Sequence, residues 1–427
     1  RRLQAALGAA AVVALLAASG AALLQARRAR DERDSARRIA GMLVDMFSIA
    51  RPGAGRDLTV KELLDRGASQ LPALEGRPET RALLTRTLAD LYEKSGHLSQ
   101  ASALYARIVE EERARGEDSL ALAAAQHDLG RSLARQGEYA RGADLFRRSL
   151  AVRRGRLGEW APEVASSLNA LALAQHELGR FQEAEPLYRR ALEVDTVSQG
   201  EDHPHTTLVR GNLALLMLDA GRLAEAEGLY RIILAEVELE GDRPPAEGEG
   251  EQLAEVRDGL GLALSGQGRH DEALPFLRAA YKQRLSAFGA GHYLVARSMA
   301  HLGMAHLEAG SLDEARTLLE TSERMRLDLL GETHMEYAES LHFSGRLHAA
   351  LGSRQEAGRA LERSAEVYRR ALGPRHPRVA ASLLDLAVLR GPGPRPGGCG
   401  PLEEARGILP SDDARLRRAQ AALPACP

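Results

Sequence analysis

Histidines recur in the linkers of this 427-residue chain, and histidine is a residue that binds metals. His203, His334 and His376 stand in similar short segments, and His292 stands in a related one. A zinc site needs about four ligands that converge, but these segments are at least 42 residues apart, no cysteine lies beside them, and only the first holds a second histidine, His205. A histidine that packs or caps at the start of a helix fits this placement better. The sequence therefore predicts no metal site and no cofactor.

Phosphoryl-transfer chemistry finds no support either. The chain lacks a glycine-rich loop before a strand, a His-Arg-Asp loop and an Asp-Phe-Gly motif. Gly248 and Gly250 lie in an acidic segment that does not suit a phosphate. We expect no enzymatic activity from these residues. The chain has 57 Lys and Arg against 59 Asp and Glu, which gives no nucleic-acid footprint.

The two cysteines, Cys399 and Cys426, leave two possibilities open. In a reducing compartment they stay thiols, whereas in an oxidising one they pair if the chain between them turns back.

Seven glycines recur with a period near 42 residues, each followed five residues later by Ala or Gly and nine residues later by a large apolar residue. They are Gly96, Gly137, Gly179, Gly221, Gly268, Gly310 and Gly352. The spacing is 42 residues in four of the six intervals and 41 and 47 in the other two. A regular period in this range is typical of a solenoid, in which each unit buries its apolar face against its neighbours.

Residues 162–203 show what one unit is. Pro162 suits the first position of a helix, and an apolar stripe follows with helical spacing up to Leu178. Gly179 suits the left-handed end of that helix. A second stripe runs from Phe181 to Leu192, so the unit is predicted to be a helical hairpin.

This pattern resembles the tetratricopeptide repeat. The turn at residues 179–184 matches its Gly-x-Tyr-x-x-Ala signature apart from Phe at the Tyr position, while the long period, the Gly-Glu-Asp-His-Pro linker at 200–204 and the Asn-Leu-Ala at 212–214 resemble the kinesin-light-chain type. The resemblance covers residues 80–409. It implies an all-α solenoid of about seven to eight hairpins, and a turn at 400–405 suggests the eighth. Residues 410–427 are predicted to cap the solenoid.

The first residues pose a different problem. Residues 3–24 carry no charge and are rich in Ala and Leu, and a bilayer core needs about 20 apolar helical residues. Arginines flank the segment, as at membrane interfaces. We predict a transmembrane helix within residues 1–28, touching the lipid bilayer through 3–24, and hence a single-pass membrane protein. The alternatives are a signal peptide and a buried or interfacial Ala-rich helix.

Residues 29–79 are predicted to form a helical juxtamembrane connector, in which Thr59 and Glu62 have the spacing of a capping box. The succession of span, connector and repeats resembles the corresponding region of bacterial transmembrane Ser/Thr protein kinases. That resemblance implies a kinase domain upstream, in the same polypeptide, and an extracytoplasmic repeat domain. The arginines after the span, taken alone, favour cytoplasmic repeats instead. Because the chain begins with Arg, we expect it to be a fragment.

In the tetratricopeptide family the first helix of each hairpin lines a concave groove. Carried over by register from each turn glycine, the groove positions that we expect to meet a peptide are Arg86, Asp90, His127, Arg131, Arg135, Asn169, His176, Asn212, Asp258, Arg297, Glu339, His342 and Arg346. Glu93, Leu173, Glu177, Asp219 and Glu308 fall on the same faces.

The sequence thus predicts a scaffold that binds a protein or peptide. The favoured interpretation is the sensor or interaction region of a bacterial membrane Ser/Thr protein kinase whose catalytic domain is absent from this chain. One alternative is a stand-alone membrane-anchored envelope scaffold with no kinase. Another is a soluble adaptor whose N-terminal helix packs on the first hairpin.

Overall fold

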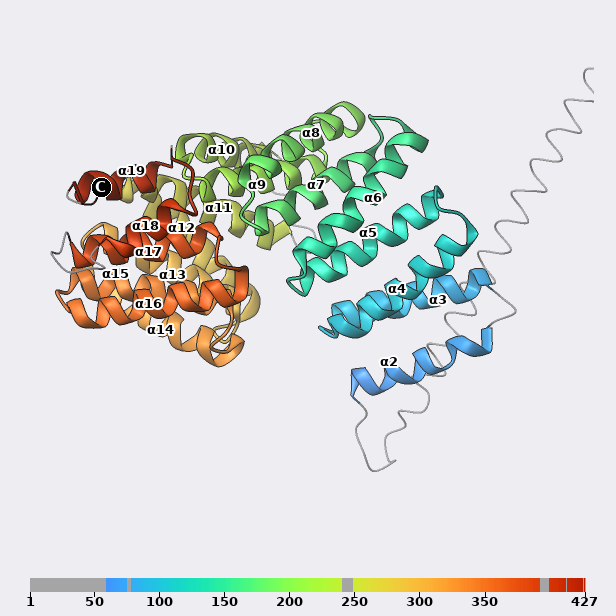
Figure 1. Cartoon of the computed structure of the whole chain (residues 1–427), viewed down its shortest axis with the longest axis horizontal. Helices are drawn as coiled ribbons and strands as arrows, with labels where there is room; N and C mark the ends of the chain where they lie inside the picture. Colours follow the sequence, from blue (N-terminus) through green and yellow to red (C-terminus); the bar gives the residue numbers. More distant parts are fainter. Residues whose placement is uncertain are drawn as a thin grey trace, which may run out of the picture. The chain divides into compact units, whose positions relative to one another are not determined.

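The computed structural model describes residues 59–74, 78–239, 249–391, 399–411, 413–424 and 426, and every regular element in these ranges is helical. After α2 (Val60–Ser69) and the short 3-10 helix η1 (Leu71–Leu74), consecutive helices pair as hairpins (Figure 1). The eight hairpins are α3 (Pro78–Lys94) with α4 (Leu98–Arg115), α5 (Leu120–Arg135) with α6 (Tyr139–Leu157), α7 (Pro162–Glu177) with α8 (Phe181–Gln199), α9 (Pro204–Asp219) with α10 (Leu223–Leu239), α11 (Glu249–Gly266) with α12 (His270–Phe288), α13 (Tyr293–Glu308) with α14 (Leu312–Leu330), α15 (Met335–Ala350) with α16 (Arg354–Leu372), and α17 (Pro377–Arg390) with α18 (Gly400–Arg406). A last helix, α19 (Ala414–Ala422), follows.

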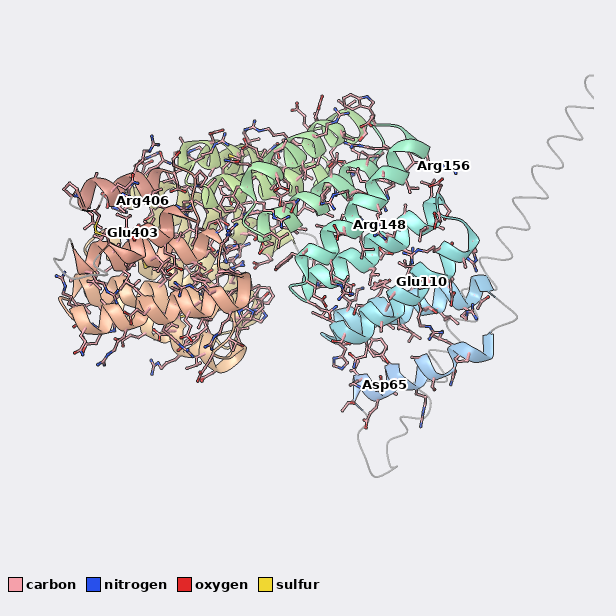
Figure 2. All side chains as sticks on the ribbon, in the orientation of Figure 1. Asp65, Glu110, Arg148, Arg156, Glu403 and Arg406 are labelled. Atoms are coloured by element: carbon pink, nitrogen blue, oxygen red, sulfur yellow. A yellow bond between two sulfur atoms is a disulfide. The ribbon has the colours of Figure 1, made fainter. Side chains whose placement is uncertain are left out.

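The chain divides into two compact units, the first ending at Val152 and the second beginning at Arg153, within α6. The core of the first unit gathers side chains from α2 to α5, among them Leu64, Tyr92 and Tyr105. The second unit holds the remaining hairpins and α19. Charged side chains stud the helices of both units, as Figure 2 shows for Glu110, Arg148 and Glu403.

The local signals read from the sequence hold where the structure tests them. Pro162 opens α7, which ends at Glu177, and Gly179 takes a φ of +72° before α8 begins. The predicted capping box also forms, because Glu62 N donates to Thr59 Oγ1 at 3.2 Å and Thr59 N donates to Glu62 Oε2 at 2.9 Å.

A serine on the second helix fixes the register of several hairpins. Its hydroxyl donates to a carbonyl oxygen of the first helix 26 residues earlier: Ser149 to Ala123 at 2.7 Å, Ser322 to Ala296 at 2.6 Å, and Ser364 to Ala338 at 2.7 Å. All three serines are fully buried. Because each hydroxyl satisfies a buried polar group, a slip of the two helices along each other would leave it unpaired.

In the second unit, the turn of the third hairpin reaches the start of the eighth. A Cβ atom at Gly179 would lie 2.3 Å from Cδ of Pro377, the first residue of α17. Arg378, the next residue, lies 3.7 Å from Asp219 at the end of α9. Hairpins that are distant in the sequence are therefore in direct contact within this unit.

The C-terminal end is held by a disulfide between Cys399 and Cys426, which settles the pairing that the sequence left open. Leu402 of α18, together with Leu416 and Leu423 in and after α19, packs into one core with α17. The boundaries at residues 28, 79 and 409 stay predictions.

The fold class and localisation as predicted were wrong in their membrane component. A bilayer-spanning helix needs about 20 apolar residues, whereas the longest described helices have 19 residues and carry several charges, as in α6 and α16. None of the helices in the described ranges is long and apolar enough to cross a membrane. Residues 3–24, predicted to form the span, lie outside those ranges. The fold class is corrected to an all-helical repeat solenoid, and the single-pass localisation is withdrawn.

The contact between the third and eighth hairpins can be tested with two turn glycines. Gly179 and Gly221 have φ values of +72° and +74°, but nothing lies within 4 Å of a Cβ at Gly221. Gly221→Ala is expected to lower the free energy of unfolding by about 1 kcal/mol, because of its left-handed backbone alone. Gly179→Ala should cost about 1–3 kcal/mol more, since the methyl group overlaps Pro377. Urea unfolding of both variants measures the difference, and equal losses would contradict the contact.

Candidate ligand-binding groove

In the first unit, four of the predicted groove residues line one cleft of about 500 Å³. They are Arg86 and Asp90 of α3 and Arg131 and Arg135 of α5. Glu93, Lys94 and Asp128 complete its walls. The fifth prediction, His127, instead lies beside Phe146, with ring centroids 5.3 Å apart.

Ion pairs orient the arginines of this cleft. Arg135 Nη1 lies 2.9 Å and Arg131 Nη2 3.5 Å from the buried Glu93 carboxylate, and Arg86 lies 3.1 Å from Asp128. The side chains of Arg131 and Arg135 nevertheless stay 49% and 56% exposed. Tyr105 donates to Asp90, and its burial and that hydrogen bond raise the pKa of its phenol far above the ordinary value. The cleft thus presents guanidinium groups that are both positioned and accessible.

In the second unit, predicted groove residues contact polar side chains of neighbouring first helices, two of which, His301 and Asp385, were not among the predicted positions. The partners are 43 residues apart, one repeat plus one position: Asn169 with Asn212 at 3.0 Å, His176 with Asp219 at 3.0 Å, Asp258 with His301 at 2.8 Å, and His342 with Asp385 at 2.7 Å. Arg346 also lies 3.1 Å from Glu308, but these two residues are 38 residues apart in the sequence. These contacts form a polar ladder along the first helices.

Two of the predicted groove residues form ion pairs with buried arginines of second helices. Arg284 of α12 donates to Asp258 at 2.9 Å and Arg326 of α14 donates to Glu339 at 2.9 Å, and both arginines are fully buried. Although burial opposes its charged form, the attraction of Arg326 lowers the pKa of Glu339 to about 2. Asp258 likewise has a lowered pKa, because His301 and Arg284 outweigh its burial. Asp258 and Glu339 therefore stabilise the packing of the solenoid's helices. Arg297 stands nearby, 3.9 Å from Glu251.

The buried arginines belong to a recurring joint that our reading of the sequence missed. Arg153, Arg284 and Arg326 each stand 16 residues after a turn glycine and donate to a serine 14 residues later, at 2.8, 2.7 and 3.2 Å respectively. The serines are Ser167, Ser298 and Ser340, each on the next hairpin. The shared register of arginine and serine is the signal that could have revealed the joint.

The linker histidines cap helices, as predicted. Nδ1 of His203, His292, His334 and His376 each accepts a hydrogen bond of 3.2 Å from the backbone N–H two residues later. Within the described ranges, no group of three or more His, Cys, Asp or Glu residues is arranged to hold a metal ion.

A cleft of about 850 Å³ in the second unit lies among α11, α13, α15, α17 and α19. Two predicted groove residues, His342 and Arg346, line it together with Glu308 and Asp385. Its apolar lining includes Leu384 and the exposed Val388. The cleft therefore offers both charges and an aliphatic surface to an extended ligand.

Comparison with protein-family models identifies one kind of repeat along the chain. Models of the tetratricopeptide repeat match residues 122–159, 163–234, 252–328 and 336–391, which together are more than half of the chain. No curated protein matches the chain significantly.

Two solved structures with TM-scores above 0.5 share the fold. A Rap protein complexed with competence and sporulation factor is 14% identical, with 80% of this chain and 89% of that chain covered and a TM-score of 0.58. The apo quorum sensor NprR from B. thuringiensis is 13% identical, with 92% and 99% covered and a TM-score of 0.53. Kinesin-light-chain repeats from Podosopora anserina are 21% identical, with 48% and 96% covered and a TM-score of 0.39.

The arginine joint predicts a large difference between two arginines of α14. Removing one partner of a buried ion pair costs about 3–5 kcal/mol, so Arg326→Leu should lower the free energy of unfolding by that much. Arg324→Leu, on the exposed side of the same helix, should change it by less than about 0.5 kcal/mol. Chemical unfolding of both variants measures the effect. A small loss for Arg326→Leu would show that the joint is not a structural support.

The cap of α17 predicts a dependence of stability on pH. Burial and the nearby Arg378 lower the pKa of His376 from 6.5 to about 4. Because the folded state disfavours the protonated ring, its contribution is complete above pH 6.5 and is lost as the pH falls towards 4, by about 3 kcal/mol in all. His376→Asn keeps a capping side chain without a titrating group.

We therefore expect the stability difference between wild type and His376→Asn to be constant above pH 7 and to shift against wild type, by up to about 3 kcal/mol, as the pH falls towards 4. Urea unfolding across this range measures it. His334→Asn, which changes the same cap in another linker, controls for the geometry of the cap itself. A difference that does not vary with pH would overturn this assignment.

Proposed function

Because the chain belongs to the tetratricopeptide-repeat family, we propose that it is a binding scaffold whose first helices hold an extended segment of a protein or peptide. The observation that carries this proposal is the pairing of groove side chains with one another while their charged ends stay accessible. Arg131, Arg135 and Arg346 are each oriented by a carboxylate and are each more than a third exposed.

Orientation before binding favours affinity. A long side chain that is immobilised on binding loses about 0.5–1.5 kcal/mol of conformational freedom, and an arginine already held by a carboxylate has lost part of that freedom. A guanidinium group has donors beyond those its partner uses, so it can add charge-assisted hydrogen bonds to a ligand carbonyl or carboxylate. The mixture of both signs along the groove suits a segment with alternating charges.

A structural neighbour supports a binding function by analogy of fold. The Rap protein of similar fold was solved with competence and sporulation factor bound. At 14% identity this likeness does not carry over ligand residues, so the choice of residues rests on the two clefts described above.

A kinase domain in the same polypeptide is the finer part of the proposal. It rests on the resemblance of the connector, whose described part includes α2 with its capping box. The coding sequence upstream of Arg1 tests it: a Gly-rich loop with His-Arg-Asp and Asp-Phe-Gly motifs would support the kinase, and an upstream frame without them would leave a scaffold acting alone.

Selection of phage-displayed random peptides on the full chain tests the binding function. Charge reversal in the clefts, by Arg135→Glu or Arg346→Glu, should weaken binding of the enriched peptides by about tenfold or more, since a lost charge-assisted hydrogen bond is worth about 1.5–3 kcal/mol. The matched controls, Arg148→Glu and Arg359→Glu, change exposed arginines of second helices and should have little effect.

Fluorescence anisotropy with labelled peptides measures the affinities, and circular dichroism checks that each variant folds. The proposal fails if no peptide is enriched, or if the outer-face variants weaken binding as much as the cleft variants do.

A further inference from the structure

The last helix lines the large cleft as well as ending the solenoid. Its Arg415, Arg418, Ala419 and Ala422 face the same cavity as His342 and Asp385. The opposite side of the helix is anchored, because Leu416, which does not line the cleft, is buried in the core shared with α17. A helix with one anchored side and one side on the cleft forms a wall of that cleft.

This wall changes the charge of the cleft. Arg346 and His342 already contact Glu308 and Asp385, so the first helices contribute charges that largely balance. Arg415 bonds to Asp413 at 2.8 Å, and Arg418 is exposed with no partner among the described residues. The helix therefore adds positive charge beside Leu384 and Val388, and Val388 is 47% exposed. Carboxylate and aliphatic side chains of an extended segment match this combination.

The wall has little to hold it by itself. It has nine residues, and isolated helices shorter than about 12–15 residues are marginal in water. The helix and the residue after it bury three apolar side chains, Leu416, Ala419 and Leu423.

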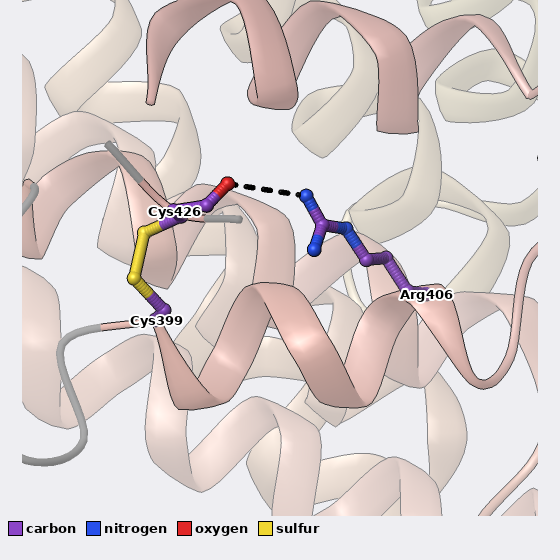
Figure 3. Close-up of a disulfide and its surroundings, with 3 residues drawn as sticks. All are labelled: Cys399, Arg406 and Cys426. Carbon is purple, nitrogen blue, oxygen red and sulfur yellow. Dashed lines mark hydrogen bonds between the residues drawn. A yellow bond between two sulfur atoms is a disulfide. The ribbon is translucent and has the colours of Figure 1, made fainter. Parts of the chain in front are cut away.

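A covalent bond and one hydrogen bond fasten its far end. Cys426, after α19, is joined to Cys399, directly before α18, and their Cα atoms lie 5.6 Å apart. Arg406 Nη2 of α18 donates to the Cys426 carbonyl oxygen at 3.4 Å (Figure 3). The disulfide closes a loop across 27 residues, which restricts the alternatives open to α19 when it detaches.

We propose that α19 is a wall of the ligand-binding cleft and that the Cys399–Cys426 disulfide holds this wall in place, so that reduction of the disulfide weakens binding there. This inference rests on the proposed binding function and adds its regulation. A dithiol reductant would act in two steps. One thiolate attacks a sulfur of the disulfide and forms a mixed disulfide, and its second thiol displaces the cysteine. The protein gains two electrons and two protons, and the reductant becomes a disulfide.

Amide hydrogen exchange of the full chain tests, without any ligand, whether the Cys399–Cys426 disulfide acts as a latch that holds α19 in place. With the disulfide intact, the amides of residues 417–422 should be protected. Dithiothreitol, or the double variant Cys399→Ser with Cys426→Ser, should speed their exchange by at least tenfold while the first helices α7 to α13 stay unchanged. Equal protection before and after reduction would overturn the latch.

Two neighbouring arginines test the wall. Arg417 and Arg418 are both exposed on α19, but Arg418 lines the cleft and Arg417 does not. With the peptides enriched on the oxidised chain, Arg418→Ala and reduction should each weaken binding by about fivefold or more, and Arg417→Ala should not. Peptides that bind equally to all four forms would show that α19 is no part of the site, while the binding function itself would stand. Enrichment of no peptide at all would instead remove the binding function, and the exchange result would still judge the latch.

Discussion

Each helical hairpin of this chain has more apolar surface than it can bury within itself, and the structure follows from the need to cover the remainder with neighbouring hairpins. Residues such as Tyr188, Phe146 and Leu277 are at most 2% exposed. Burying a side chain of this size contributes about 1.5–3 kcal/mol, whereas an exposed ion pair contributes about 0–1 kcal/mol. The apolar contacts therefore supply most of the stability. The buried polar joints, such as Arg326 with Ser340, select one register among the packings that those contacts allow.

Local features were predictable because each depends on a few residues close in sequence. A left-handed turn at Gly179, a histidine cap at His203 and a capping box at Thr59 are set by backbone geometry and short-range hydrogen bonds. Burial of Arg284 and Arg326 was not predictable in the same way, because arginine is exposed in most settings and only the packing of the next hairpin encloses it. The contact of Gly179 with Pro377 depends on the accumulated rotation of several hairpins, which no single repeat contains.

The candidate site shows the same division. Register from the turn glycines named Arg86, Asp90, Arg131 and Arg135, which line one cleft in the structure, while their contact with a ligand stays a prediction. It gave no sign that Asp258 and Glu339 are engaged by arginines from behind, nor that a helix after the last repeat contributes to a cleft. Pairing among groove residues also sets a requirement on any ligand. A partner that displaces an existing carboxylate must match its charge, since an unpaired guanidinium in a partly buried cleft is unfavourable. Such a groove discriminates among segments by charge pattern more than by shape.

Open solenoids are modular, because each repeat contacts only the adjacent ones and a repeat can be gained or lost with modest effect. The meeting of Gly179 with Pro377 removes that freedom from the second unit. Deleting or duplicating one hairpin between these residues would rotate and shift the eighth hairpin relative to the third and separate the two surfaces. The structure thus constrains the number of repeats between these residues. Repeats should be gained or lost in evolution only outside this stretch.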